Sequence, residues 1–194
     1  MRSGRGGRRF HAVPLLLVVT WTIAVSVTPA HARRAVRVDR SSFLEDGDVF
    51  VAIRVAVAIG EILYRFRSDF PQPPPIDIVV RAQNAAESDQ WDETLSSAGC
   101  ELIAGRAEII VNPRILRGAR ALNDAELRSL LGHEIRHAYQ FASGEAANNS
   151  PDLWRREVEA FEWELSNGDP AVRPWYRQET ARQLRLYQTF LSDD

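Results

Sequence analysis

The spacing of apolar positions along this chain predicts four helices and three short strands. The first helix is expected from residue 42 to about residue 67, and Ser42 and Glu45 have the spacing of a capping box at its start. Its apolar stripe recurs at i, i+4, i+8, i+11 and i+15 and consists of Val51, Val55, Ile59, Ile62 and Phe66. The prolines of residues 71–75 end this helix and form a stiff connector.

Alternating apolar positions predict the strands. Residues 76–81 place Ile76, Ile78 and Val80 on one side of an extended segment. Residues 100–104 and 107–112 predict a β-hairpin with Gly105-Arg106 as its two-residue turn. Residues 84–98 fit a short helix or an irregular loop equally well.

The next predicted helix runs from Asn123 to about Phe141, with Glu126 as the capping-box partner of Asn123. One face of it is apolar and consists of Leu127, Leu131, Ile135 and Ala138. Two further helices are expected at residues 152–167 and 173–191, after a polar loop. These elements predict a single α+β domain at residues 42–194 that is mostly helical.

The N-terminal segment has the features of a secretory signal peptide. Four arginines precede an apolar stretch from Val13 to Val27, and Ala30-His31-Ala32 matches a cleavage site. We therefore expect cleavage after Ala32 and a secreted or periplasmic protein, with a retained N-terminal anchor as the alternative. Residues 33–41 are expected to form a loose, arginine-rich polar leader.

Composition narrows the class of partner. Removal of residues 1–32 takes away four arginines and no acidic residue, which leaves 20 basic and 26 acidic side chains, a net charge of −6. This balance argues against a nucleic-acid or anionic-membrane partner. Cys100 is the only cysteine, so no internal disulfide can form, and we expect it to be a small buried apolar residue.

The candidate chemistry lies in the segment His133-Glu134-Ile135-Arg136-His137, which contains the only histidines after residue 32. On a helix, residues i and i+4 lie about 40° apart around the axis, so both imidazoles can share one metal ion. The apolar face of this helix begins about 120° from His133, and the two imidazoles therefore point away from it. This HExxH pattern predicts a zinc site in which Glu134 takes a proton from a zinc-activated water molecule.

A catalytic zinc needs a third protein ligand, and no histidine remains to supply it. The helix at 152–167 offers the carboxylates Glu157, Glu159, Glu162 and Glu164. Its apolar stripe is predicted to be Trp154, Val158, Phe161 and Leu165. Both Glu157 and Glu162 flank the centre of that stripe at about 70°, whereas Glu159 lies about 130° away and should face solvent.

The pair His133-Glu134-x-x-His137 and Glu157-x-x-Ala160, 20 residues after His137, resembles the zinc site of gluzincin-type metallopeptidases. The resemblance implies a zincin-like fold with a small antiparallel sheet before the HExxH helix. It also implies Zn²⁺ held by His133, His137 and Glu157, with Glu134 as the catalytic base. The substrate would be a peptide or protein, held as an extended strand against an edge of the sheet.

Several roles remain open at this level. Asp152 or Glu126 could orient a ligand histidine, and Tyr176, Tyr187 or an arginine could stabilise the oxyanion, because Tyr139 projects away from the site. Two other functions also fit the sequence. One is a catalytically inactive zinc-binding protein of the same fold, and the other is a helical interaction protein in which the HExxH pattern is accidental.

Overall fold

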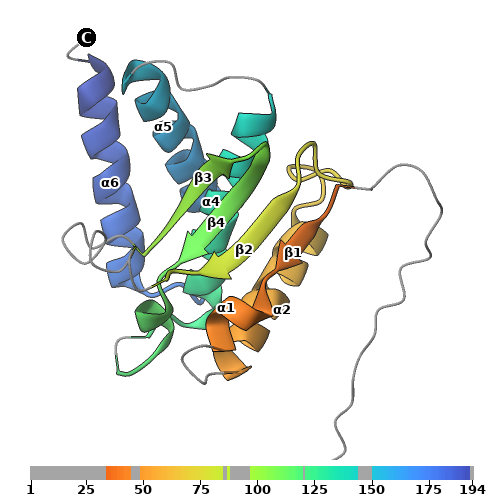
Figure 1. Ribbon diagram of the computed structural model, residues 1–194. Coiled ribbons are helices and arrows are strands. Elements are labelled where there is room, and N and C mark those ends of the chain that lie inside the picture. Colours follow the sequence, from red (N-terminus) through yellow and green to blue (C-terminus); the bar gives the residue numbers. More distant parts are fainter. Residues whose placement is uncertain are drawn as a thin grey trace, which may run out of the picture. The chain divides into compact units, whose positions relative to one another are not determined.

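The computed structural model describes residues 34–44, 49–84, 87, 97–119, 121–143 and 150–192 (Figure 1). The predicted signal peptide lies outside the described residues, as does most of the ambiguous segment 84–98. The strands are β1 (Val36–Val38), β2 (Ile78–Ala82), β3 (Ala98–Ile103) and β4 (Arg106–Val111). The helices are α1 (Arg40–Leu44), α2 (Val49–Arg65), the 3-10 helix η1 (Pro113–Leu116), α4 (Asp124–Ala142), α5 (Ser150–Ser166) and α6 (Pro174–Ser192).

The sheet is mixed, with strand order β1-β2-β4-β3. The strands β1, β2 and β4 are parallel, and only β3 runs antiparallel, at the edge beside β4. The expectation of an antiparallel sheet is therefore wrong except for the β3–β4 hairpin. The expectation of a loose leader at 33–41 is also wrong, because Val36–Val38 pairs with β2 and Val36 lies opposite Ile78. Three residues are too few to show a strand period, so only the pairing with β2 reveals this strand.

The hairpin turn is one residue earlier than predicted. Ala104 and Gly105 form it, with φ values of 49° and 78°, and Arg106 already pairs with Ile103. Positive φ at both central positions is the requirement of a tight two-residue hairpin, and glycine meets it readily at the second position. This register directs Ile109 and Val111 into the core together with Cys100 of β3.

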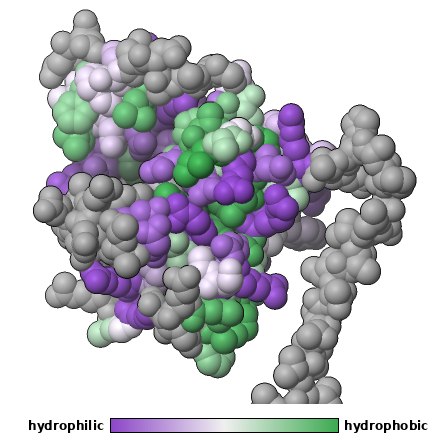
Figure 2. Space-filling view, viewed as in Figure 1, coloured by the Kyte–Doolittle hydropathy of each residue, from purple (hydrophilic) through white to green (hydrophobic). Residues whose placement is uncertain are grey.

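The core lies between the sheet and the helices α2 and α4, which Figure 1 shows behind the sheet. The predicted apolar stripes of these helices are confirmed: Val51, Val55, Ile59 and Ile62 of α2 are buried, and so are Leu127, Leu131, Ile135 and Ala138 of α4. The opposite face of the sheet, towards the viewer in Figure 2, is rich in hydrophilic residues. On that face the buried carboxylate of Glu108 pairs with Arg81 and Arg106.

The first predicted helix is two elements, α1 and α2, on either side of residues 45–48, which lie outside the described part of the chain. Ser42 therefore serves a different purpose from the expected cap. Its hydroxyl donates to the carbonyl of Asp39 at 2.7 Å and accepts from the amide of Ala82 at 2.9 Å. These bonds attach α1 to the end of β2.

The start of α4 is fixed as predicted. Asn123 and Glu126 form a complete capping box, in which each side chain bonds the other residue's amide at 2.9 Å. Glu126 is fully buried and also pairs with Arg173, directly before α6. Farther along α4, Gly132 admits the ring of Trp163 from α5, because a methyl group there would lie 2.4 Å from two ring carbons. These contacts attach α5 and the residue that precedes α6 to α4.

The buried face of α5 differs from the predicted stripe. Its buried residues are Arg156, Ala160 and Glu164, whereas Trp154 and Phe161 of the stripe are only half-buried. Residues of this apolar stripe contact α6 instead: Trp154 packs on Phe190, and Phe161 stacks on Tyr187. The face towards α4 instead combines the carboxylates of Glu157 and Glu164 with the ring of Trp163. Among the described helices, none is both long and apolar enough to cross a lipid bilayer.

Candidate metal centre

Two helices bring three ligand side chains together. His133 and His137 project from α4, and Glu157 reaches them from α5. The two Nε2 atoms are 3.1 Å apart, and the Glu157 oxygens lie 3.6 Å from Nε2 of His133 and 3.3 Å from Nε2 of His137. The histidines are 5% and 8% exposed. The two ring nitrogens and the carboxylate of Glu157 therefore surround one buried point.

This donor set fits zinc. A tetrahedral Zn²⁺ with bonds of about 2.0–2.1 Å places its ligand atoms about 3.3 Å from one another. The two histidine nitrogens are 3.1 Å apart, and Oε2 and Oε1 of Glu157 lie 3.6 Å and 3.3 Å from His133 and His137, so each of these contacts is close to this value. Two imidazoles and one carboxylate also leave one tetrahedral position for water or substrate, which is the arrangement of a catalytic zinc site.

The glutamates of α5 lie in different surroundings. Glu157 joins the histidine pair, whereas Glu159 is exposed and bonds Gln140 at 3.0 Å, and Glu162 is also exposed. Ala160, three residues after Glu157, is fully buried. The small side chain of alanine is compatible with the close approach of neighbouring helices at this point of α5.

The ligands strongly influence one another's charge. Burial alone would raise the pKa of Glu157, but hydrogen bonds from His133 and His137 lower it to about 2. Burial alone would lower the pKa of His133, but hydrogen bonds to Glu157 and Glu164 raise it to about 10. The carboxylates thus stabilise positive charge at this point, as a cation site requires.

Glu134 is the candidate base. Its side chain is 5% exposed, and burial raises the pKa of its carboxyl, although the neighbouring histidines oppose this shift. A carboxylate with a raised pKa is a stronger proton acceptor near neutral pH.

Cys100 lies on β3 and is half-buried. Burial raises the pKa of its thiol most, and the negative charge of Glu134 raises it further. Cys100 therefore stays protonated and packs against the core.

The second ring nitrogen of each histidine faces a side chain that the sequence analysis did not assign. Nδ1 of His137 lies 2.8 Å from Oε1 of Gln140, and Nδ1 of His133 lies 3.3 Å from Oε2 of Glu164. The expected Asp152 and Glu126 do not fill this position, because Asp152 pairs with Arg155 and Glu126 caps α4. Such contacts orient a ligand imidazole and increase its basicity.

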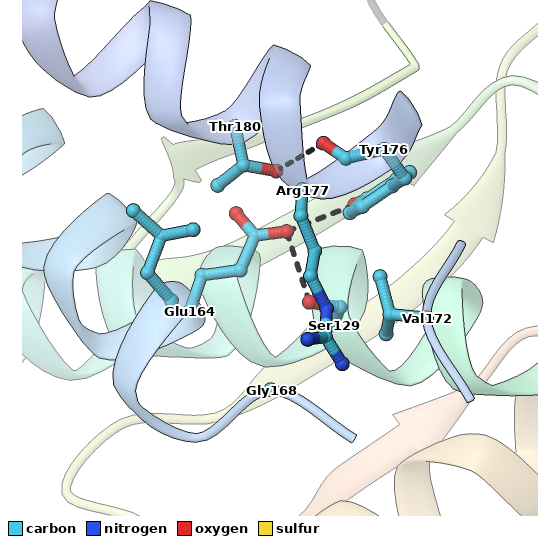
Figure 3. A pocket seen from close by; sticks show the side chains of 8 residues that line it. Ser129, Glu164, Gly168, Val172, Tyr176, Arg177 and Thr180 are labelled. Carbon is cyan, nitrogen blue, oxygen red and sulfur yellow. Dashed lines mark hydrogen bonds between the residues drawn. The ribbon is translucent and has the colours of Figure 1, made fainter. Parts of the chain in front are cut away.

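Glu164 is itself held in place (Figure 3). Its Oε1 accepts hydrogen bonds from Ser129 Oγ at 3.0 Å and from the Tyr176 hydroxyl at 2.9 Å. A pocket of about 60 Å³ lies beside this carboxylate, lined by Glu164, Tyr176 and Thr180 among others, and by none of the three ligand residues. The seven-residue spacing from Glu157 to Glu164, nearly two helical turns, was the available signal that both carboxylates lie on neighbouring faces.

Tyr139, Tyr176 and Tyr187 make different contacts. Tyr139 points away, as expected, and its hydroxyl donates to the carbonyl of Pro71 at 2.8 Å. The Tyr176 hydroxyl donates to Glu164. Tyr187 stacks on Phe161, whose ring centre is 4.4 Å from that of His133. Burial and the charge of Glu157 both raise the pKa of Tyr187.

A comparison of the chain with protein-family models, with curated proteins and with solved structures found no match.

Proposed function

We propose that this protein is a zinc-dependent metallopeptidase of the gluzincin type with a zincin-like fold. The observation that carries the proposal is the convergence of His133, His137 and Glu157 at 3.1–3.6 Å, with the buried Glu134 on the same helix. The spacing matches the ligand separations of a tetrahedral zinc ion, and the open fourth position suits catalysis.

The residues then have distinct roles. Zn²⁺ held by the three ligands would polarise the scissile carbonyl and lower the pKa of water. Glu134 accepts the proton of the attacking water and returns it to the leaving amine, a task that its raised pKa supports. Gln140 and Glu164 hold the imidazoles in orientation. Of the two candidate tyrosines, Tyr187 is the one left to stabilise the oxyanion, because Tyr176 donates to Glu164.

A peptide substrate is supported by the position of β3. Among the described strands it has only one neighbour, β4, and it packs against α4, which carries the motif. An extended peptide can add to such an edge through backbone hydrogen bonds, with its scissile bond beside the motif helix. The predicted signal peptide would place this activity in the periplasm or outside the cell.

Zinc stoichiometry tests the proposal first. Purified protein should contain about one zinc per chain, and Glu157→Ala should weaken binding while Glu159→Ala, on the exposed side of the same helix, should not. Absence of zinc from the unmodified protein would overturn the metal site.

Hydrolysis tests the mechanism. Glu134→Gln should retain zinc and lose cleavage of a broad peptide library, because the amide cannot accept the proton. Unchanged cleavage by this variant would contradict the role of Glu134. Bound zinc without any cleavage by the unmodified protein would instead support the inactive zinc-binding protein.

A further inference from the structure

Among the residues that the structure describes, Arg156 is a buried cation without a counter-ion. It precedes the ligand Glu157 on α5 and is only 5% exposed, yet neither Nη1 nor Nη2 has a hydrogen-bond partner in the described part of the chain. An unpaired buried charge strongly destabilises a fold, so such groups are normally paired. This guanidinium therefore has the donors for a partner that the described residues do not supply.

The acidic side chains nearest to Arg156 in the sequence of α5 are engaged elsewhere. Glu157 faces the two histidines, Glu159 bonds Gln140, and Asp152 pairs with Arg155. Among the described residues, Arg156 forms no ion pair with an acidic side chain. Its only recorded guanidinium contact is with the ring of Phe141 on α4, whose centre lies 5.7 Å from the central guanidinium carbon.

Phe141 places this cation on the working side of α4. It follows His137 by four residues and Glu134 by seven, so it lies about 40° and about 20° from them around the helix axis. The midpoint of the two histidines is about 9 Å from Phe141 along the axis. Because an extended peptide advances about 3.3 Å per residue, this corresponds to about two or three residues of substrate.

The position of Arg156 is also linked to the metal ligands through the backbone. Gln140 donates from Nε2 to the carbonyl oxygen of Arg156 at 3.3 Å, and its Oε1 contacts Nδ1 of His137 at 2.8 Å. One side chain therefore holds both the ligand imidazole and the start of the Arg156 side chain. This connection ties the backbone of Arg156 to the ligand His137, and the contact with Phe141 positions the guanidinium.

We propose that Arg156 binds a carboxylate group of the substrate. The planar guanidinium presents paired donors that match the two oxygens of a carboxylate, and burial excludes the water that would screen their attraction. The carboxylate would lie about two or three residues from the scissile bond. This assignment of substrate class rests on the proposed peptidase function, whereas carboxylate binding itself does not.

Thermal unfolding of the zinc-free protein tests the binding site alone. The probe is N-acetylglycine, with its uncharged amide as the reference compound, at constant ionic strength. At a concentration about 100 times its dissociation constant, the acid should raise the midpoint temperature by about 5–10 °C, and the amide should not.

Two neighbouring arginines provide a matched pair of variants. Arg156→Met should abolish the response to N-acetylglycine, because methionine keeps an apolar contact with Phe141 but has no donors. Arg155→Met, at an exposed position on the same helix, should respond like the unmodified protein. If Arg156→Met does not fold, Arg156→Lys retains the charge without the paired donors and should show a weakened response. A full response in the folded Arg156 variant would overturn the proposal.

Cleavage kinetics of the zinc-loaded protein then distinguish the source of the carboxylate. Three matched peptides are compared: one with a free C-terminus, one amidated, and one amidated with glutamate near the cleavage site. Loss of the preferred carboxylate should lower kcat/KM by about 30-fold or more, and Arg156→Met should remove the difference. Equal cleavage of all three would overturn the substrate role. A thermal response without any cleavage would support the carboxylate site and contradict the peptidase function.

Discussion

The contact between Glu164 and His133 makes a quantitative prediction about metal affinity. Glu164→Gln keeps the shape of the side chain but removes the negative charge 3.3 Å from Nδ1 of His133. The buried amide cannot satisfy every neighbour. Its oxygen can accept from Ser129 and Tyr176, but its NH2 group, which can only donate, then faces Nδ1 of His133 in place of a carboxylate oxygen.

The magnitude follows from these contacts. Loss of an orienting partner of a ligand histidine typically lowers metal affinity by 10- to 100-fold, or about 1.4–2.7 kcal/mol. Turning the amide to satisfy His133 would free the hydroxyls of Ser129 and Tyr176 and cost about 1–3 kcal/mol of stability. Either orientation therefore lowers metal affinity, the free energy of unfolding, or both.

Competition with a chelator measures the effect directly. The zinc dissociation constants of the unmodified protein, Glu164→Gln and Glu162→Gln are compared, with urea unfolding of each zinc-free protein. Glu162 lies two residues away on the same helix and is exposed, so its substitution should change neither quantity appreciably. A zinc affinity of Glu164→Gln within twofold of the unmodified value, at unchanged stability, would refute the orienting role of Glu164.

Two further predictions concern the scaffold. Gly132→Ala should lower the free energy of unfolding by about 1–3 kcal/mol, because its new methyl group would lie 2.4 Å from ring carbons of Trp163 and overpack the site. Gly60→Ala should raise the free energy of unfolding by up to about 1 kcal/mol, because Gly60 is an exposed helical position with nothing within 4 Å of a new methyl group. Thermal unfolding of both variants shows whether the two changes have opposite signs. Glu108 contributes stability that is complete above about pH 4.5, because the hydrogen bond from Arg81 lowers its pKa in the folded protein, and this contribution is lost as the pH falls towards that lower value. Glu108→Gln should therefore flatten the acid side of the stability curve below about pH 4.5, which urea unfolding at several pH values measures; an unchanged slope would contradict it.

The α4 helix was predictable because its signals are local. The capping box of Asn123 and Glu126 involves residues three apart, and the i, i+4 spacing of His133 and His137 places both on one face regardless of the rest of the fold. The apolar stripe through Leu131 and Ile135 also follows from helical period alone, because most of its partners are equally apolar.

The environment of α5 was less predictable. Its most apolar stripe turned out to face α6, whereas its most buried residues include Arg156 and Glu164. Hydrophobicity indicates the buried face only where the partner is apolar, and here the partner on α4 is a polar cluster. The role of Glu164 therefore could not be found from the stripe, although it is buried beside His133.

The sequence by itself determined the motif helix, its apolar back, and the common direction of the two imidazoles, because residues within one or two helical turns have fixed relative positions. Only the tertiary structure decided the pairing of Val36–Val38, the hairpin turn at Ala104-Gly105, and the closeness of the Glu157 side chain to the two histidines. Each of these features depends on contacts between segments that are far apart in the sequence. Strand pairing, turn register and the closeness of two helices are set by contacts that no local period contains.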